Sequence, residues 1–166
     1  MSSFSWSSFS LRIPVQASVQ KLYWCMATQQ GLEYWFLRSS QFLSENDVRL
    51  QPGVYVSVGD SYTWLWHGWT DEVVEHGSIL STNHKDELAF SFGLAGNVSI
   101  RLVPSDGYTM VELVQDQIPD NEMGRHHWHL GCKTGWIFYL TNLKSLLEGG
   151  IDLRNKDATI LQVLNA

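Results

Sequence analysis

The sequence has few of the features that mark a disulfide-rich, secreted or membrane-spanning protein. It contains only two cysteines, Cys25 and Cys132, and neither belongs to a CxxC pair, which disfavours a disulfide framework and a four-thiolate zinc site. No window approaches the ~20 apolar residues that a membrane span requires. The N-terminal residues MSSFSWSSFSLRIPV lack the basic start and the apolar core of a secretory signal. We therefore expect a cytoplasmic protein without a membrane span.

Positive charge is also scarce. The chain has 11 Lys and Arg against 17 Asp and Glu, a net charge of −6, and the basic residues are scattered rather than gathered into a stripe. This distribution disfavours nucleic acid and anionic membrane surfaces as partners. With 44% hydrophobic and 17% charged residues, the chain has the composition of a protein with a sizeable core. We expect a single domain over residues 1–166.

Tryptophan, in contrast, is abundant. The 166 residues include eight tryptophans, three of them in the segment YTWLWHGW at residues 62–69. Large aromatic side chains are difficult to pack tightly, so a small protein rich in them has either a bulky core or an aromatic-lined cavity. Composition alone leaves both alternatives open.

The first part of the chain predicts a strand followed by two short helices. Residues 8–15 alternate apolar and polar side chains, as a half-buried strand does, and Pro14 places this strand at a sheet edge or near its own end. Helical spacing begins after Ser18, which is a suitable N-cap. Gly31 is expected to break this helix, with a second short helical turn in residues 31–36.

The middle of the chain, residues 38–117, predicts an antiparallel meander, because β-prone segments follow one another at short intervals between turn signals. The Gly59-Asp60 pair separates two such segments and predicts a hairpin. Leu88, Phe90 and Phe92 share one face of their strand. No helical window interrupts this region.

A long C-terminal helix is expected from about Glu122 to Glu148, before Gly149-Gly150, with a length of about 40 Å at ~1.5 Å per residue. At 100° per residue, one broad apolar face also includes His129. The apolar members of this face are Trp128, Cys132, Trp136, Tyr139, Leu140, Leu143, Leu146 and Leu147. His127, Thr134 and Phe138 fall on or near the opposite side. The residues after the helix predict a polar tail with a surface pair of Asp152 and Arg154.

The cluster RHHWHLGC raises the question of a metal site. Its four candidate ligands, His126, His127, His129 and Cys132, do not converge on one side of the helix. His126 and His129 could share a metal with a third ligand from His67, His76 or His84, but no carboxylate or thiolate spacing supports such a site. Cys132 has no partner base in the sequence, which favours a buried thiol over a nucleophile. We therefore predict no metal and no cofactor.

Three segments resemble a known family. IPVQASVQKLYWCMATQQGLEYWF, YTWLWHGW and GCKTGWIFYLTNLKSLLEGGIDLRN are similar to blocks of START-like (SRPBCC) proteins, in the group named after the C-terminal domain of the activator of the heat-shock-protein-90 ATPase. They look most like a bacterial subgroup without an assigned activity. The resemblance covers about residues 9–155, and Gly135-Trp136 is its most specific element. It implies an α+β helix-grip fold, in which a curved antiparallel sheet wraps around the long C-terminal helix and two short helices follow the first strand.

The same resemblance implies an apolar cavity between the sheet and the long helix. The sheet would contribute Tyr62, Trp64, Trp66, Phe90 and Phe92 to its lining. The helix would contribute His129, Cys132, Trp136, Tyr139 and Leu140. Rigid aromatic walls with a few polar groups suit a small hydrophobic or aromatic ligand.

We therefore expect a protein that binds a small hydrophobic molecule and is not an enzyme. One alternative is a chaperone-assisting module of the heat-shock-protein-90 activator type, although the chain is too short to include the second N-terminal domain with which that activator makes much of its chaperone contact. Another alternative is a cyclase-like enzyme that uses the same cavity, with His129 as acid or base near Tyr139. Catalysis would also need a group that orients His129, and the sequence shows none.

Overall fold

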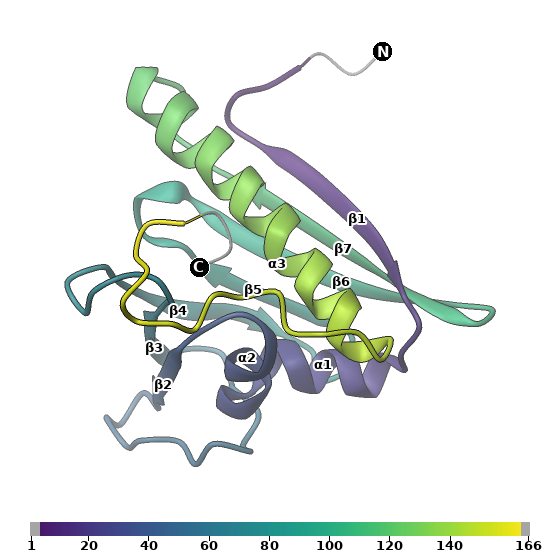
Figure 1. Ribbon diagram of the computed structural model, residues 1–166. Helices are drawn as coiled ribbons and strands as arrows, with labels where there is room; N and C mark the ends of the chain where they lie inside the picture. The colour runs from purple at the N-terminus through teal and green to yellow at the C-terminus, as the bar shows by residue number, and fades with distance from the viewer. Residues whose placement is uncertain (1–3, 164–166) are drawn as a thin grey trace.

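A computed structural model describes residues 4–163 as a seven-stranded antiparallel sheet with helices packed against one face (Figure 1). In chain order the elements are β1 (Phe9–Val15), α1 (Val19–Ala27), α2 (Gln29–Trp35), β2 (Ser39–Leu43), β3 (Ser61–Leu65), β4 (Val74–Thr82), β5 (Glu87–Ser91), η1 (Gly93–Ala95), β6 (Asn97–Ser105), β7 (Tyr108–Asp116), η2 (Gly124–Leu130) and α3 (Gly131–Leu147). The strand order is β1-β7-β6-β5-β4-β3-β2. This arrangement confirms the predicted α+β helix-grip fold.

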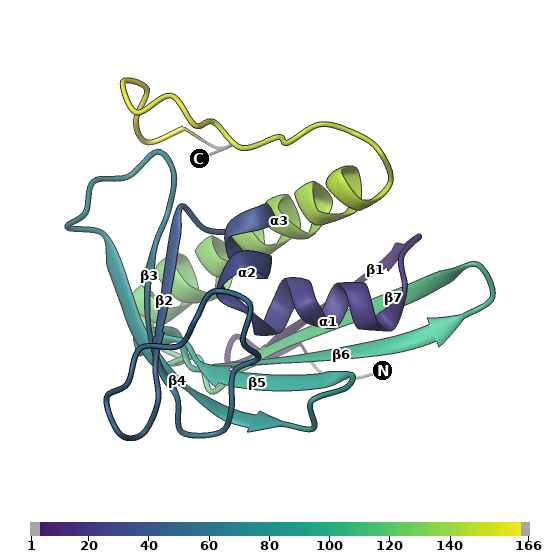
Figure 2. The same ribbon diagram turned by 90° about the horizontal axis from the view of Figure 1, so that it is seen from below.

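The core lies between the sheet and the three helices. Its buried members include Leu22 and Met26 of α1, Val98 and Leu113 of the sheet, and Leu143 of α3. Figure 2 shows α1 and α3 both lying along the face of the sheet formed by β5, β6 and β7. Within residues 4–163, no helix combines the length and the apolar character that a membrane crossing requires.

The edge position of β1 follows from its proline. Pro14 lies opposite Met110 of β7, and β1 has β7 as its one neighbour in the sheet. Proline has no backbone N–H to donate, so an edge strand with one partner tolerates it where a central strand would not. The sequence-based placement of this strand is confirmed.

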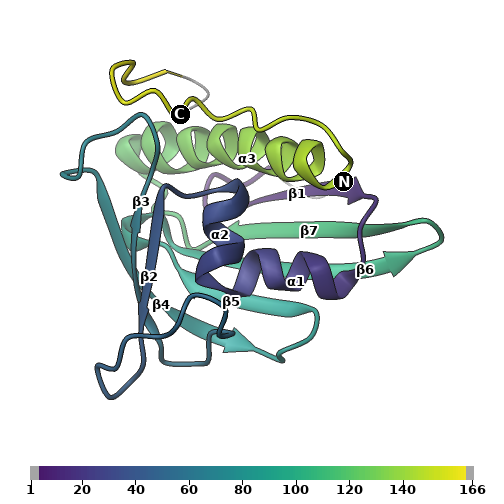
Figure 3. The same ribbon diagram turned by 60° about the horizontal axis from the view of Figure 1, so that its bottom comes forward.

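The sheet bends at β4. Residues of β4 as far as Ser78 pair with β3, whereas those from Ile79 pair with β5, and the register shifts between Ile79 and Ser81. Such a shift is the signature of a β-bulge, which increases local twist. Figure 3 shows the result, with β2 and β3 running across the direction of β6 and β7. The bent sheet therefore faces the helices from two sides.

Two local predictions were wrong in detail. A turn forms at Gly59-Asp60, but it leads from an irregular segment into β3, and the hairpin is absent because β3 pairs with β2 and β4. Gly31 lies inside α2 and does not end α1, since the break falls at Thr28, whose hydroxyl accepts a hydrogen bond from the Gly31 N–H (2.9 Å). Gly31 is required for close packing, because a Cβ there would lie 2.0 Å from the carbonyl oxygen of Trp24.

The long C-terminal helix is present, but its first turns are wound as a π-helix. η2 covers Gly124–Leu130 and continues directly into α3. Gly124 is packed tightly against the preceding segment, because a Cβ there would lie 1.7 Å from the carbonyl oxygen of Pro119. A π-turn contains more residues than an α-turn, so side chains of η2 point in directions that 100° spacing does not predict.

The segment after α3 is not a polar tail with a surface ion pair. Arg154 is only 6% exposed, and its guanidinium donates to the carbonyl oxygens of Glu33, Tyr34 and Leu37 at and just after the end of α2. Beyond it the chain returns toward the β3–β4 connection, where the Gln162 N–H donates to the Gly68 carbonyl (3.0 Å). Figure 2 shows this yellow segment passing over α3 toward β3.

Candidate functional site

Part of the expected cavity lining is packed into the core. Tyr62 and Trp64 are stacked with their ring centroids 3.8 Å apart, and the edge of Phe90 meets Trp64 at 5.2 Å. Leu140 is also buried in this core. None of these four residues lines either of the two pockets described below. These aromatic rings fill the interior against one another, and the four residues therefore belong to the core rather than to a pocket wall.

A smaller cavity remains between Phe36 after α2, the β3 and β5 ends, and the long helix. This inner cavity has a volume of about 170 Å³. Its walls are formed by Phe36, Trp66, Phe92, His127, Gly131, Cys132, Gly135, Trp136 and Tyr139. Five of the residues named from the sequence meet here, namely Trp66, Phe92, Cys132, Trp136 and Tyr139.

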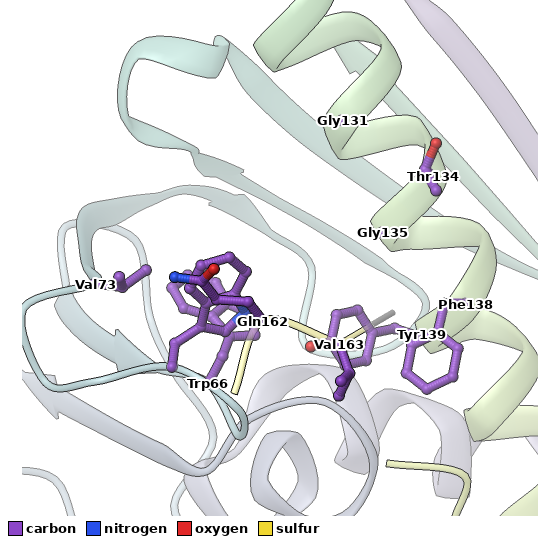
Figure 4. A pocket seen from close by; sticks show the side chains of 10 residues that line it. Trp66, Val73, Gly131, Thr134, Gly135, Phe138, Tyr139, Gln162 and Val163 are labelled. Atoms are coloured by element: carbon purple, nitrogen blue, oxygen red, sulfur yellow. The ribbon is translucent and has the colours of Figure 1, made fainter. Parts of the chain in front are cut away.

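A wider pocket of about 410 Å³ adjoins the inner cavity and shares four of its wall residues. The shared residues of this mouth pocket are Trp66, Gly131, Gly135 and Tyr139, and the others are Trp69, Val73, Thr134, Phe138, Gln162 and Val163. Figure 4 shows Gln162 and Val163 between the strand end that carries Trp66 and the helix that carries Tyr139. The segment after the long helix therefore forms part of the wall.

The open space at the inner cavity depends on Gly135. A Cβ added at Gly135 would have no atom within 4 Å, even though this residue lines both pockets. Glycine in the interior of a helix is unfavourable by roughly 1 kcal/mol relative to alanine. Gly135 therefore lowers the stability of the helix, at a position where a larger side chain would enter the cavity.

A buried hydrogen-bond chain holds the ring of Trp136 in the wall. Its Nε1–H donates to Oε1 of Gln115 (2.9 Å), and Nε2 of Gln115 donates to the carbonyl oxygen of Ala95 (2.9 Å). Gln115 is fully buried and comes from β7. The chain fixes the amide orientation of Gln115 and, through it, the orientation of the indole.

Replacing Trp136 with phenylalanine should lower the free energy of unfolding by about 1–3 kcal/mol, because Gln115 Oε1 would be left buried without a donor. Urea denaturation of the wild type and the variant would measure this loss. Combining the change with Gln115→Leu should recover only part of it, since the unpaired Oε1 is then absent but the Ala95 carbonyl also loses its donor. A single variant as stable as the wild type would contradict the importance of the hydrogen bond.

His129 lies away from the cavity. It is 2% exposed, and its Nδ1 lies 2.9 Å from the carbonyl oxygen of Trp6. Because a carbonyl only accepts, Nδ1 carries the proton. The rings of Trp6 and Phe9 pack on the imidazole with centroid distances of 5.1 and 5.4 Å. The π-wound start of the helix turns His129 toward the N-terminal segment, and His129 lines neither the inner cavity nor the mouth pocket.

The histidine and cysteine side chains are spread apart within residues 4–163. Among residues 4–163, no group of three or more His, Cys, Asp or Glu side chains is placed to hold a metal ion. Burial raises the pKa of the Cys132 thiol, against the lowering effect of a hydrogen bond with Gln115. A raised pKa keeps the thiol protonated and weakly nucleophilic at neutral pH.

His67 lies near Arg154, the residue that holds the C-terminal segment against the end of α2. Its burial and the positive charges of Arg154 and Lys156 lower the pKa of His67 to about 4, although Asp152 acts in the opposite direction and Arg38 adds a smaller lowering effect. An unfolded histidine has a pKa near ~6.5. Between these values the unfolded chain binds more protons than the folded one, so protonation destabilises the fold there.

We therefore expect the free energy of unfolding to fall as the pH falls from about 6.5 to about 4, with a contribution from His67 that is fully retained above this range. Urea denaturation at several pH values would measure the slope. His67→Gln should flatten it, whereas the same change at the exposed His84 should not. Equal slopes in the wild type and the His67 variant would contradict the assignment.

Several wall residues were missed by sequence-based reasoning. His127, Thr134 and Phe138 were assigned to the side of the helix opposite the apolar face, yet all three line a pocket. The mouth pocket is built at the helix flank, where it is closed by the β3–β4 connection and by Gln162 and Val163. The available signal was the pair Gly131 and Gly135. Because these glycines are four residues apart, they lie on the same side of the helix and leave that side without side chains.

Comparisons with known proteins agree with this architecture. A family model described as Activator of Hsp90 ATPase homolog 1-like protein matches residues 16–148. A comparison with curated proteins finds no match. Among solved structures, the protein SSP2350 from Staphylococcus saprophyticus has a TM-score of 0.65 at 19% identity, covering 95% of this chain and 98% of that one.

Two further structures share the fold at low identity. The Aha1 dimer from Colwellia psychrerythraea has a TM-score of 0.64 at 18% identity, covering 86% of this chain and 97% of that one. DynU16, described as a putative protein in the dynemicin biosynthetic locus, has a TM-score of 0.66 at 17% identity, covering 90% of this chain and 50% of that one. The family match extends over most of the sequence, and the chain belongs to the family of Activator of Hsp90 ATPase homolog 1-like proteins.

Proposed function

We propose that this protein binds a small apolar or aromatic molecule in the inner cavity and the adjoining mouth pocket. The observation that carries the proposal is an unfilled pocket, open to solvent on one side, that is lined by five aromatic side chains. These are Phe36, Trp66, Phe92, Trp136 and Tyr139. Ligand sites are typically concave, largely apolar and equipped with a few fixed polar groups.

The size of the inner cavity limits its occupant. Apolar cavities of about 150 Å³ accept molecules the size of benzene, and the inner cavity measures about 170 Å³. A molecule with one aromatic ring would fit within it, and a two-ring molecule would extend past Gly131 and Gly135 into the mouth pocket. A lipid with long acyl chains would exceed both spaces.

We propose binding without catalysis. The thiol of Cys132 faces the cavity, but burial raises its pKa. The phenol of Tyr139 also has a raised pKa, again because of burial, against a smaller lowering effect of Arg154. Both groups therefore favour their neutral forms at neutral pH, which suits hydrogen bonding to a ligand better than nucleophilic or base chemistry.

Native mass spectrometry of freshly purified protein, compared with the denatured mass, tests this proposal. A retained organic mass that is lost on denaturation would support it and reveal the ligand class. A mass shift equal to a zinc ion would instead point to the histidines of the η2 region. Protein that is purified as a clean apo form and then also fails to bind naphthalene-type probes would contradict the proposal.

A chaperone-assisting role is the second candidate, because the family is named after an activator of the Hsp90 ATPase. In this case a surface rather than the cavity would make the contact. A binding measurement with the middle and N-terminal domains of the chaperone decides between the two, since no complex at tens of micromolar protein would exclude this role.

A further inference from the structure

A glutamate on β4 faces the interior of the grip beside the inner cavity. Glu75 lies directly opposite Trp64 in the β3–β4 pairing, and directly opposite residues point to the same side of a sheet. Trp64 is buried in the core, whereas the next pair, Thr63 and His76, lies on the other side and is hydrogen-bonded there. The carboxylate of Glu75 is therefore on the helix side of the sheet.

The position of the carboxylate is further defined by Gly93. A Cβ added at Gly93 would lie 2.3 Å from Oε1 of Glu75, so the carboxylate rests against this glycine. Gly93 directly follows Phe92, a wall residue of the inner cavity, and the charge of Glu75 also acts on the thiol of Cys132 in the wall formed by the helix. Glu75 is not itself a wall residue of the inner cavity, but it lies next to the wall at Phe92 and its charge reaches the wall at Cys132.

Within residues 4–163 the carboxylate of Glu75 forms no ion pair with a lysine or arginine. It accepts a hydrogen bond from the backbone N–H of the adjacent His76 (3.2 Å). Glu75 is half-buried, and this burial raises its pKa against the smaller lowering effects of that hydrogen bond and of the His76 charge. Trp64, which lies opposite Glu75, is buried, and its Nε1 has no hydrogen-bond partner among the described residues. Polar groups in such surroundings are costly unless something pairs with them.

We propose that Glu75 determines the ligand specificity of the inner cavity by accepting a hydrogen bond from a cationic or hydrogen-bond-donating nitrogen on an aromatic ligand. This inference rests on the proposed function and narrows it to aromatic amines and related molecules. The aromatic body would occupy the space between Trp66 and Trp136, and the nitrogen would point toward Phe92 and Gly93. An anionic ligand of the same shape would be repelled by the carboxylate.

The test uses three probes of similar shape: 2-(aminomethyl)naphthalene, 2-methylnaphthalene and 2-naphthoate. Titrations of the full-length ¹⁵N-labelled protein would follow the indole N–H signals of Trp66 and Trp136. We expect the amine to bind about tenfold more tightly than the methyl compound, and the carboxylate to bind more weakly than either. In Glu75→Gln the amine should lose about this tenfold advantage, while the affinity for 2-methylnaphthalene should stay unchanged.

The control variant is Glu122→Gln, which removes the same charge from an exposed side chain at the start of the helix and should leave all three affinities unchanged. Equal binding of the amine and the methyl compound to the wild type would overturn the role of Glu75 and leave the proposed function intact. The same holds if Glu75→Gln retains the preference for the amine. Probes that shift neither indole signal would contradict the proposed function, and this inference with it.

Discussion

Replacing Arg154 with alanine is expected to lower the free energy of unfolding by about 3 kcal/mol, the lower end of the cost of breaking a buried ion pair from one side, because Asp152 would keep Lys156 as a partner (2.7 Å). The guanidinium donates to both carboxylate oxygens of Asp152, at 2.9 and 2.7 Å, and to three carbonyl oxygens around the end of α2. The last carbonyls of a helix have no partner within the helix, so Arg154 acts as their cap. Its loss would leave these carbonyls without a donor, with the Leu37 carbonyl in a buried position.

Urea denaturation of three variants would measure this effect. Arg154→Lys keeps the charge but lacks the planar fork that bonds several acceptors at once, and should retain only part of the stability. Arg101→Ala is the matched control, because Arg101 forms an exposed pair with Glu87 at 3.7 Å, which is expected to contribute less than about 1 kcal/mol. If the Arg154→Ala and Arg101→Ala variants lost equal stability, the buried hydrogen bonds of Arg154 would not contribute more than an exposed ion pair.

Replacing Gly135 with leucine is expected to abolish ligand binding while leaving the protein at least as stable as the wild type. A Cβ at this position meets no atom within 4 Å, and a longer side chain would extend into the inner cavity. Leucine favours a helix over glycine by roughly 0.5–1 kcal/mol and would also bury apolar surface. We expect the dissociation constant of 2-methylnaphthalene to rise more than about a hundredfold, equal to about 2.7 kcal/mol.

The same titration and a thermal melt would separate the two effects. Gly135→Ala should gain most of the helix stability while reducing the affinity less, because a methyl group fills little of the cavity. Leucine at the exposed Ile137 should change neither property, since this side chain points away from the sheet. A Gly135→Leu variant that binds the probe as well as the wild type would show that the ligand lies elsewhere.

The sequence predicted the fold well because its signals are local and repeated. Alternation in residues 8–15, the proline in that strand and the long apolar face of the helix each specify one element. The break between α1 and α2 was placed at the wrong residue, because Gly31 serves a close backbone contact rather than helix termination. Local propensity does not distinguish these two uses of glycine.

The candidate site was predicted only in part, for two physical reasons. The π-wound turns of η2 rotate His127 toward the cavity and His129 away from it, and no sequence pattern in this segment announces such winding. How completely the aromatic rings fill the interior depends on tertiary packing, so the sequence did not separate the buried stack of Tyr62 and Trp64 from the half-buried pocket wall at Trp66. Glu75 was missed because a lone glutamate in a strand carries no motif.

The position of Gln162 and Val163 in the wall of the mouth pocket has a practical consequence for screening. A fluorescent dye or a cross-linker attached to either side chain would stand in the wall of the pocket itself. Such a label would occupy part of the space that a ligand needs and would change the affinity it is meant to report. Labels for screening ligand libraries should therefore be placed at other positions.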